Sequence, residues 1–274
     1  MNHSHLPAKV IREILTQLEG FLIDLDGTTY LGDDLIPGAL MFVEILQKLG
    51  KPHLFLTNNS SESAHTYVEK LRRLGIDAQD GSVLTSGDAT AMHLADAGYT
   101  KLFVLGTPSF ENELKEFGFI LTSERPDCVV LGFDKTLNYQ KLAIATDLIR
   151  RKIPFVATHP DKVCPTEDGF IPDCGAITAL LAAATDVDPL VIGKPKPQMV
   201  QMALKRLNLD SRKIAIIGDR LYTDIRMGLD AGLVTVLVLS GETTPEMLLS
   251  EIEMRPLIVV ERLGTLCGYL LNLY

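Results

Sequence analysis

Two patterns of apolar residues alternate along the chain. Short runs of β-branched and aromatic residues predict buried strands, and longer segments with apolar residues every three or four positions predict amphipathic helices. The predicted strands are residues 21–26, 53–58, 82–86, 101–106, 128–133, 154–158, 190–193, 213–219 and 235–240. The predicted helices are residues 8–18, 39–50, 63–75, 88–98, 109–118, 138–151, 175–186, 197–208 and 223–232. Strands that alternate with helices indicate βαβ units, so we expect an α/β fold with a parallel sheet.

The length and composition of the chain limit its class. Its 274 residues fit two domains, and 46% hydrophobic with 22% charged residues is typical of a globular protein. A formal net charge of −9 argues against nucleic-acid binding, which needs a basic surface. No stretch has the apolar character of a signal peptide or a membrane span, so we expect a cytoplasmic protein without a membrane partner. The four cysteines form no CxxC pair and are interpreted as free thiols, with a Cys164–Cys174 bridge or a metal site as alternatives.

The first predicted strand carries two aspartates, although apolar strands rarely bury carboxylates without a partner. Asp24 and Asp26 would point to the same side if the strand continued through both, and Gly27 would end it. The pair then lies at or just past the carboxyl end of a strand, where parallel α/β sheets bind ligands. A structural turn is the alternative, because Asp-x-Asp-Gly also occurs in ordinary turns and in calcium-binding loops.

The second predicted strand ends in polar residues that could bind an anion. It leads into Thr57, Asn58 and Asn59, and Asn59 has the spacing of a capping box with Glu62. A hydroxyl and backbone amides at a helix N-terminus form an anion site, although plain helix capping explains the same residues.

Two later strands also end in charged residues. Lys194 follows a short strand and a glycine, where it could meet a phosphate or be an ordinary solvated lysine. Asp219 follows another strand, and Asp224 lies five residues further on, where it could also cap a helix. If Asp24, Asp26 and Asp219 converge at one edge of the sheet, they repel one another by about 4 kcal/mol per pair at 4 Å, and a divalent cation would offset this. Oxygen ligands favour Mg²⁺ over zinc.

These four motifs, in this order, resemble those of the haloacid dehalogenase (HAD) superfamily of phosphohydrolases. The segments DLDGTTY, TNNSS, IGKPKP, GDRLYTDI and VLVLSGETTPE are similar to signatures of its NagD-like, p-nitrophenylphosphatase branch. The resemblance covers nearly the whole chain apart from about the first 19 residues and the extreme C-terminus. It implies a Rossmann-like HAD core with an inserted α/β cap domain, in a Mg²⁺-dependent phosphatase that hydrolyses small phosphate monoesters through an aspartyl-phosphate.

The resemblance also implies a role for each motif. Asp24 would be the nucleophile, and Asp26 the general acid and base. The magnesium ligands would be Asp24 and Asp219 by their side chains and Asp26 by its backbone carbonyl, with Asp224 in an outer position. The transferring phosphoryl group would be bound by Thr57, Asn58, Asn59 and Lys194.

The long segment between the second and third motifs contains the expected cap. We expect residues 1–100 and 189–274 to form the core and residues 101–188 the cap, which in this branch faces the substrate. The cap residues expected at the substrate cleft are Thr158, His159, Asp161, Cys164 and Asp173, unless Asp161, Glu167 and Asp168 form a solvated acidic loop. Relatives selective for pyridoxal phosphate have a histidine where we align Cys164, which disfavours that substrate. Relatives also dimerise through the cap, so a homodimer is a partner to test.

Several other functions stay open as alternatives. A sugar-phosphate or nucleoside monophosphate phosphatase would share the mechanism and differ in the cap. A catalytically idle HAD-fold binding protein is disfavoured because every motif residue is intact. A dinucleotide-binding Rossmann protein would need Gly-x-Gly-x-x-Gly after the first strand, where this chain has DLDGTTYLG. A phosphomutase or kinase-like transferase would need a donor or acceptor site that no motif indicates.

Overall fold

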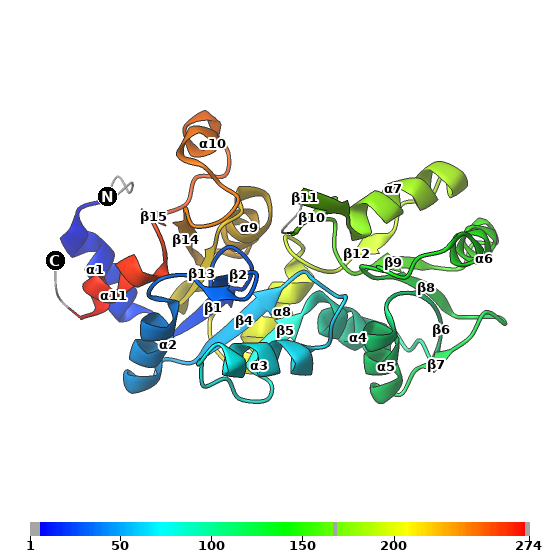
Figure 1. The fold of residues 1–274 in the computed structure, drawn as a ribbon, viewed down its shortest axis with the longest axis horizontal. Coiled ribbons are helices and arrows are strands. Elements are labelled where there is room, and N and C mark those ends of the chain that lie inside the picture. Colours follow the sequence, from blue (N-terminus) through cyan, green and yellow to red (C-terminus); the bar gives the residue numbers. More distant parts are fainter. Residues whose placement is uncertain (1–5, 167–168, 272–274) are drawn as a thin grey trace. The chain divides into compact units, whose positions relative to one another are not determined.

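The computed structural model describes residues 6–166 and 169–271, which form two compact units. The first, here called the six-stranded unit, comprises the described residues up to Thr57, Val68–Val83, and the described residues from Val200 onward. The second, the five-stranded unit, comprises Asn58–Tyr67 and Leu84–Met199. Each unit has its own sheet with helices packed on it (Figure 1), which confirms the predicted α/β fold. Within the described ranges, no helix is both long and apolar enough to span a lipid bilayer.

The sheet of the six-stranded unit has the strand order β15-β14-β13-β1-β4-β5. The bounds are β1 Gly20–Asp24, β4 His53–Thr57, β5 Val83–Thr85, β13 Ile214–Gly218, β14 Val234–Val238 and β15 Ile258–Val260. Strand β1 pairs in parallel with both β13 and β4, and every residue of β1 and β13 is buried. Such burial on both faces explains why these strands read as continuous apolar runs in the sequence.

Helices and short segments complete this unit. They are α1 Ala8–Gln17, α2 Ala39–Lys48, most of α3 Ala64–Arg73, most of α8 Pro197–Leu207, α9 Arg226–Ala231, α10 Pro245–Ser250, α11 Leu263–Leu270, the 3₁₀ turn Ser211–Lys213, the π-helical turn η2 Leu221–Ile225, and the hairpin of β2 Tyr30–Leu31 and β3 Asp34–Leu35. Helix α11 lies beside α1 and α2 (Figure 1), and the fully buried Ile11 and Leu15 anchor α1. The N-terminal helix is therefore an integral part of this unit.

The five-stranded unit has the strand order β12-β9-β8-β6-β7, and these strands pair in parallel. The strands are β6 Lys101–Leu105, β7 Ile120–Leu121, β8 Cys128–Leu131, β9 Phe155–Ala157 and β12 Leu190–Val191. The helices are α4 Ser86–Asp96, α5 Pro108–Glu116, α6 Tyr139–Arg150 and α7 Cys174–Thr185. Leu148 of α6 and Leu181 of α7 share a buried cluster with Val129 and Leu131 of β8. An antiparallel hairpin, β10 Val163–Thr166 and β11 Gly169–Pro172, precedes α7.

All nine predicted strands and all nine predicted helices are present. The apolar pattern did not predict six further features: the hairpins β2–β3 and β10–β11, the strands β7 and β15, and the helices α10 and α11. These elements are short, so each contains too few apolar positions to show a period. One predicted strand is shorter than expected, since β1 ends at Asp24 and not at Asp26. Strands of the five-stranded sheet span residues 101–191, while the expected cap boundary at residue 188 stays a prediction.

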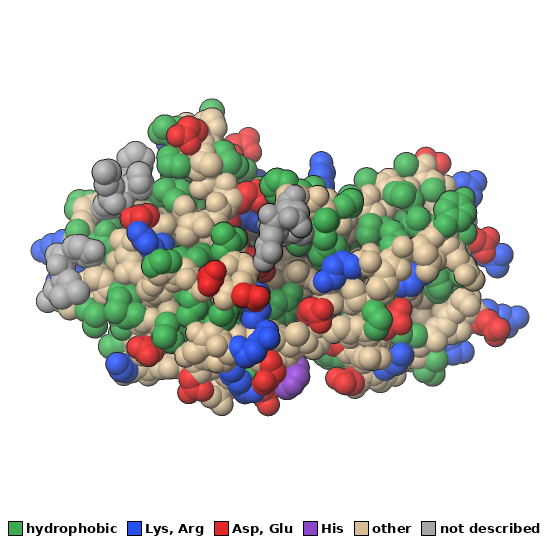
Figure 2. Space-filling model, viewed as in Figure 1, with side chains coloured by type: hydrophobic (Ala, Val, Ile, Leu, Met, Phe, Trp, Pro, Cys, Tyr) green, Lys and Arg blue, Asp and Glu red, His purple; other side chains and the backbone are tan. Residues whose placement is uncertain are grey.

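Charged side chains of both signs are mixed over the surface that Figure 2 shows. On that face, Lys and Arg side chains lie among Asp and Glu side chains and do not gather into a separate field. The net charge of −9 is therefore not concentrated in one acidic region of this face.

Candidate active site

Three strands of the six-stranded unit bring polar residues to one edge of the sheet. The parallel register pairs Ile23 with Ile217 and Asp24 with Leu56. Asp24 therefore ends β1 at the level where β13 and β4 also end. Thr57 is the last residue of β4, and Asp219 is the first residue after β13. Two of the three aspartates considered from the sequence, Asp24 and Asp219, thus lie together at the carboxyl edge, with Thr57 beside them in the register.

A group of three buried carboxylates forms at this edge. Asp24, Asp219 and Asp224 are at most 6% exposed, and each offers an oxygen atom within 4.8 Å of the other two. At that separation, two ionised carboxylates repel each other by roughly 3 kcal/mol at an effective dielectric constant near 20. A divalent cation removes this cost, and an all-oxygen donor set of this kind suits Mg²⁺. The residues present therefore fit a magnesium ion.

The π-helical turn η2 brings Asp224 against the end of β13. Asp224 Oδ2 accepts a hydrogen bond from the Arg220 amide at 3.3 Å and lies 3.4 Å from the Thr223 hydroxyl. Its Cγ atom would lie only 2.2 Å from a Cβ atom at position 218, so the strand must end in a glycine there. The family resemblance implied that Asp224 lies in an outer position around the metal. The sequence alone did not show why residue 218 is a glycine.

Asp26 lies in a tight turn and not on the strand. The Thr29 amide donates to the Leu25 carbonyl at 2.8 Å, the Thr29 hydroxyl donates to the Asp24 carbonyl at 2.7 Å, and Gly27 adopts a left-handed φ of 81°. Because β1 ends at Asp24, the condition for strand alternation is not met and the turn sets the position of Asp26. The two aspartates lie at and just past the carboxyl end of the strand, as expected from the sequence. Asp26 is partly buried, and its catalytic role stays a prediction.

The predicted capping box after β4 is wrong. Helix α3 begins at Ala64, and the Asn59 side-chain oxygen instead accepts a hydrogen bond from the Ser61 amide at 2.9 Å. Asparagine readily forms such a local turn with the amide two residues ahead, which competes with helix capping. Ser63 accepts from the Thr66 amide at 3.3 Å at the start of α3. The loop after Thr57 is therefore not a helix N-terminus, and the expected anion site of that type is absent from this loop.

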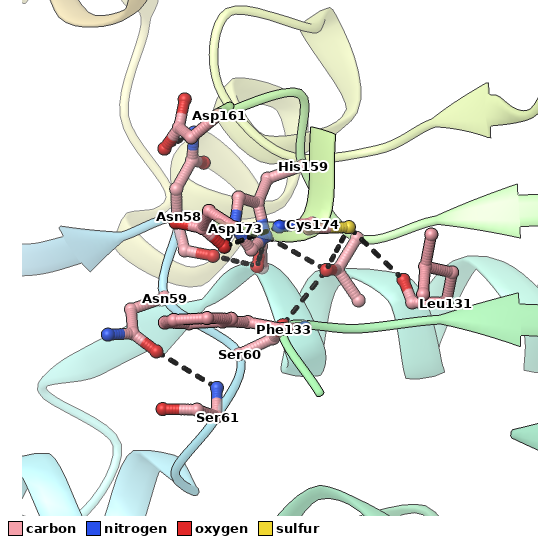
Figure 3. A network of polar contacts seen from close by, with 12 residues as sticks. Asn58, Asn59, Ser60, Ser61, Leu131, Phe133, His159, Asp161, Asp173 and Cys174 are labelled. Carbon is pink, nitrogen blue, oxygen red and sulfur yellow. Dashed lines mark hydrogen bonds and ion pairs between the residues drawn. The ribbon is translucent and has the colours of Figure 1, made fainter. Parts of the chain in front are cut away.

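Asn58 and Lys194 are joined in the five-stranded unit. Lys194 is 3% exposed and follows β12, which pairs with β9 and not with the sheet of Asp24. The Asn58 side chain accepts a hydrogen bond from the Lys194 amide at 2.8 Å and donates to the Lys194 carbonyl at 3.0 Å. It also donates to Asp161 Oδ2 at 3.2 Å (Figure 3). The Asn58 side chain thus holds the Lys194 backbone, a role that no sequence motif indicated.

Four of the five residues expected at the substrate cleft belong to a buried hydrogen-bond network, namely Thr158, His159, Asp161 and Asp173 (Figure 3). The fifth, Cys164, is only partly buried, and its contact with substrate stays a prediction. His159 lies with Nδ1 2.9 Å from the Thr158 hydroxyl and with Nε2 2.9 Å from Asp173 Oδ1, and its side chain is fully buried. Asp173 also accepts from the Cys174 amide at 2.6 Å and caps α7. Asp161 is likewise buried, which contradicts the alternative of a solvated loop at that residue, whereas Glu167 and Asp168 lie outside the described residues.

This network also accounts for a second group of potential metal ligands, His159, Asp161 and Asp173. Both ring nitrogens of His159 already have hydrogen-bond partners, so the geometry is that of a structural network. All four cysteines are free, which confirms their interpretation as thiols. Burial raises the pKa of Cys174 to about 12, so this thiol stays protonated and unreactive at neutral pH.

Comparison with known proteins agrees with this geometry. Residues 21–120 match the family model of haloacid dehalogenase-like hydrolases, and residues 191–266 match a second, HAD-hydrolase-like model. The crystal structure of 4-nitrophenylphosphatase from Thermotoga maritima is 44% identical, with a TM-score of 0.91 over 94% of this chain and 99% of that one. NagD from E. coli K-12 is 30% identical, with a TM-score of 0.85 over 90% of this chain and 98% of that one.

A curated relative extends the comparison. An acid sugar phosphatase of Staphylococcus aureus is 41% identical over 234 residues, which are 85% of this chain and 90% of that protein. Matches of this identity over most of both chains establish the family. The chain therefore belongs to the haloacid dehalogenase-like hydrolases, within the branch that contains NagD and 4-nitrophenylphosphatase, and it is a phosphatase of that branch.

Proposed function

We propose that this phosphatase hydrolyses small phosphate monoesters with the help of Mg²⁺ and through an aspartyl-phosphate at Asp24. The observation that carries the proposal is the group of three buried carboxylates, Asp24, Asp219 and Asp224, at the carboxyl edge of a parallel sheet. Ligands bind at this edge in open α/β sheets. When bound, Mg²⁺ would neutralise these carboxylates and the negative charge of the phosphoryl group.

Two aspartates carry the proposed chemistry, and they need opposite protonation behaviour. Asp24 attacks phosphorus, displaces the alcohol and becomes the aspartyl-phosphate, so its carboxylate must be ionised. Asp26 donates its proton to the leaving oxygen and then accepts a proton from the water that hydrolyses the intermediate. The separate surroundings of the two residues support this division, because Asp24 ends a buried strand and Asp26 lies in the partly buried turn after it.

The remaining motif residues bind the phosphoryl group in this proposal. The Thr57 hydroxyl, the amide of Asn58 and the neighbouring Asn59 donate to its oxygens, and Lys194 offsets its charge. Rigid placement supports the assignment of Lys194, because the Asn58 side chain holds its backbone through two hydrogen bonds. Donors held in place before the reaction need no reorganisation during it, which is how they lower the barrier.

We assign the choice of leaving group to the five-stranded unit, which we propose to be the cap. Sequence similarity to 4-nitrophenylphosphatase supports aryl phosphates as substrates, and similarity to the S. aureus acid sugar phosphatase supports sugar phosphates. Both classes share a phosphate monoester and differ only beyond the bridging oxygen. A panel of aryl, sugar and nucleoside monophosphates assayed with Mg²⁺ would separate them by kcat/KM.

The mechanism is tested by Asp24→Asn, assayed with p-nitrophenyl phosphate and Mg²⁺. We expect turnover to fall below detection, because the amide cannot form the phosphoenzyme. Asp34→Asn is the matched control, since Asp34 is an exposed residue of β3, and it should retain parental turnover. Full activity in Asp24→Asn would refute the nucleophile. Turnover that persists in excess EDTA would refute the requirement for a divalent metal.

A further inference from the structure

The loop that follows β14 wraps around the Asp219 carboxylate. The Glu242 amide donates a hydrogen bond to Asp219 Oδ2 at 2.6 Å, and the Thr243 amide donates to the Asp219 carbonyl at 3.2 Å. A backbone N–H to an ionised carboxylate is a charge-assisted hydrogen bond, which is shorter and stronger than a neutral one. Residues 240–243 therefore fix both the backbone of Asp219 and the rotation of its side chain.

Two glycines leave the space that this carboxylate occupies. A Cβ atom at position 241 would lie 2.0 Å from Asp219 Oδ2, and one at position 27 would lie 2.6 Å from the same oxygen. The Ser240 hydroxyl donates to the Gly27 carbonyl at 2.7 Å, which ties the loop to the turn after β1. The carboxylate thus lies in a narrow slot whose two sides are joined by a hydrogen bond.

An ion pair holds the loop from the outside. Arg220, the residue after Asp219, places its Nε atom 3.0 Å from Glu242 Oε2, and the Tyr222 hydroxyl donates to the same oxygen at 3.1 Å. The Arg220 side chain is only 17% exposed, so solvent screens this pair less than a surface pair. Glu242 therefore contacts the Asp219 segment through its amide and through its side chain.

We propose that residues 240–243 form a positioning element that sets the orientation of Asp219 for metal binding. The element works through the Glu242 amide, the missing side chain of Gly241 and the Arg220–Glu242 ion pair. This inference rests on the proposed magnesium site and extends it to residues that do not themselves bind the ion. Loss of groups that orient metal ligands typically costs 10- to 100-fold in metal affinity.

The test measures metal binding directly, without substrate, by titrating Mn²⁺ into the full-length protein and following the free ion by electron paramagnetic resonance. Gly241→Ala adds a methyl group against Asp219 Oδ2 and should weaken Mn²⁺ binding about 10- to 100-fold. Gly50→Ala is the control for backbone strain away from the site, because a Cβ atom there meets nothing within 4 Å while its φ of 63° disfavours alanine. Its Mn²⁺ affinity should match that of the parent. Unchanged affinity in Gly241→Ala would overturn the proposal.

A second variant keeps the proposal testable if Gly241→Ala fails to fold. Glu242→Gln retains the amide and removes the charge that pairs with Arg220, so we expect a several-fold loss of Mn²⁺ affinity at low ionic strength and a smaller loss at high salt. Parental affinity at both salt concentrations would refute the role of the ion pair. A parent protein that binds Mn²⁺ but hydrolyses no phosphate ester would refute the proposed function and leave this inference intact.

Discussion

Glu113 of α5 is a buried carboxyl that should make the stability of the five-stranded unit depend on pH. Its Oε1 atom accepts a hydrogen bond from the Ala64 amide at 3.2 Å, while Oε2 is buried without a hydrogen-bond partner. Burial, together with the negative charge of Asp88, raises the pKa of Glu113 from 4.5 to about 8. The folded protein therefore carries a proton on Glu113 at neutral pH, where the unfolded chain has released it.

The magnitude follows from this difference in proton binding. Between pH 4.5 and about 8 the folded state binds one more proton than the unfolded state, so the free energy of unfolding falls by about 1.4 kcal/mol per pH unit. From pH 5 to pH 7 the loss is about 3 kcal/mol, a large part of the stability of a typical domain. The contribution is complete below pH 4.5 and is lost as the pH rises through 8.

Glu113→Gln removes this titration while keeping the shape of the side chain and its acceptor for the Ala64 amide. We expect urea denaturation, followed by circular dichroism at pH 5, 6 and 7, to show the variant gaining about 1.4 kcal/mol over the parent for each pH unit. Glu124→Gln, at an exposed position of the same unit that does not act on Glu113, is the control and should track the parent. Parallel curves for Glu113→Gln and the parent would refute a protonated Glu113.

Two further substitutions test the architecture of the site. Asn58→Ala removes the side chain that holds the Lys194 backbone. We expect kcat to fall on the order of 100-fold, the usual cost of misplacing a catalytic group by about 1 Å. Asn59→Ala should lower kcat less, and equal losses in the two variants would contradict the role of Asn58. Gly218→Ala places a Cβ atom 2.2 Å from Asp224 Cγ, so overpacking should lower the free energy of unfolding by about 1–3 kcal/mol. Thermal denaturation tests this, and an unchanged melting temperature would show that Asp224 can move away at no cost.

Several features of the protein were determined by the sequence itself. Apolar periodicity located the principal strands and helices, because the spacing of buried residues follows directly from strand and helix geometry. The sequence also placed Asp24 and Asp219 at the carboxyl ends of two buried strands, and parallel strands present these ends at one edge of the sheet. Such patterns involve only residues close together in the chain, so they can be recognised from the sequence alone.

Other features depended on contacts between residues far apart in the chain. No local pattern predicted that Asp224 lies beside Asp24 or that residues 240–243 surround the Asp219 carboxylate. Nor did one predict the hydrogen bond from the Asn58 side chain to Lys194, which lies 136 residues away. At Asn59 two local preferences competed, and the turn to the Ser61 amide formed in place of the capping box, so the helix begins at Ala64. The chain thus encodes which chemical groups are present, whereas packing decides which of them share a site, because hydrogen bonds and close contacts act over a few ångströms of space and not over distance along the sequence.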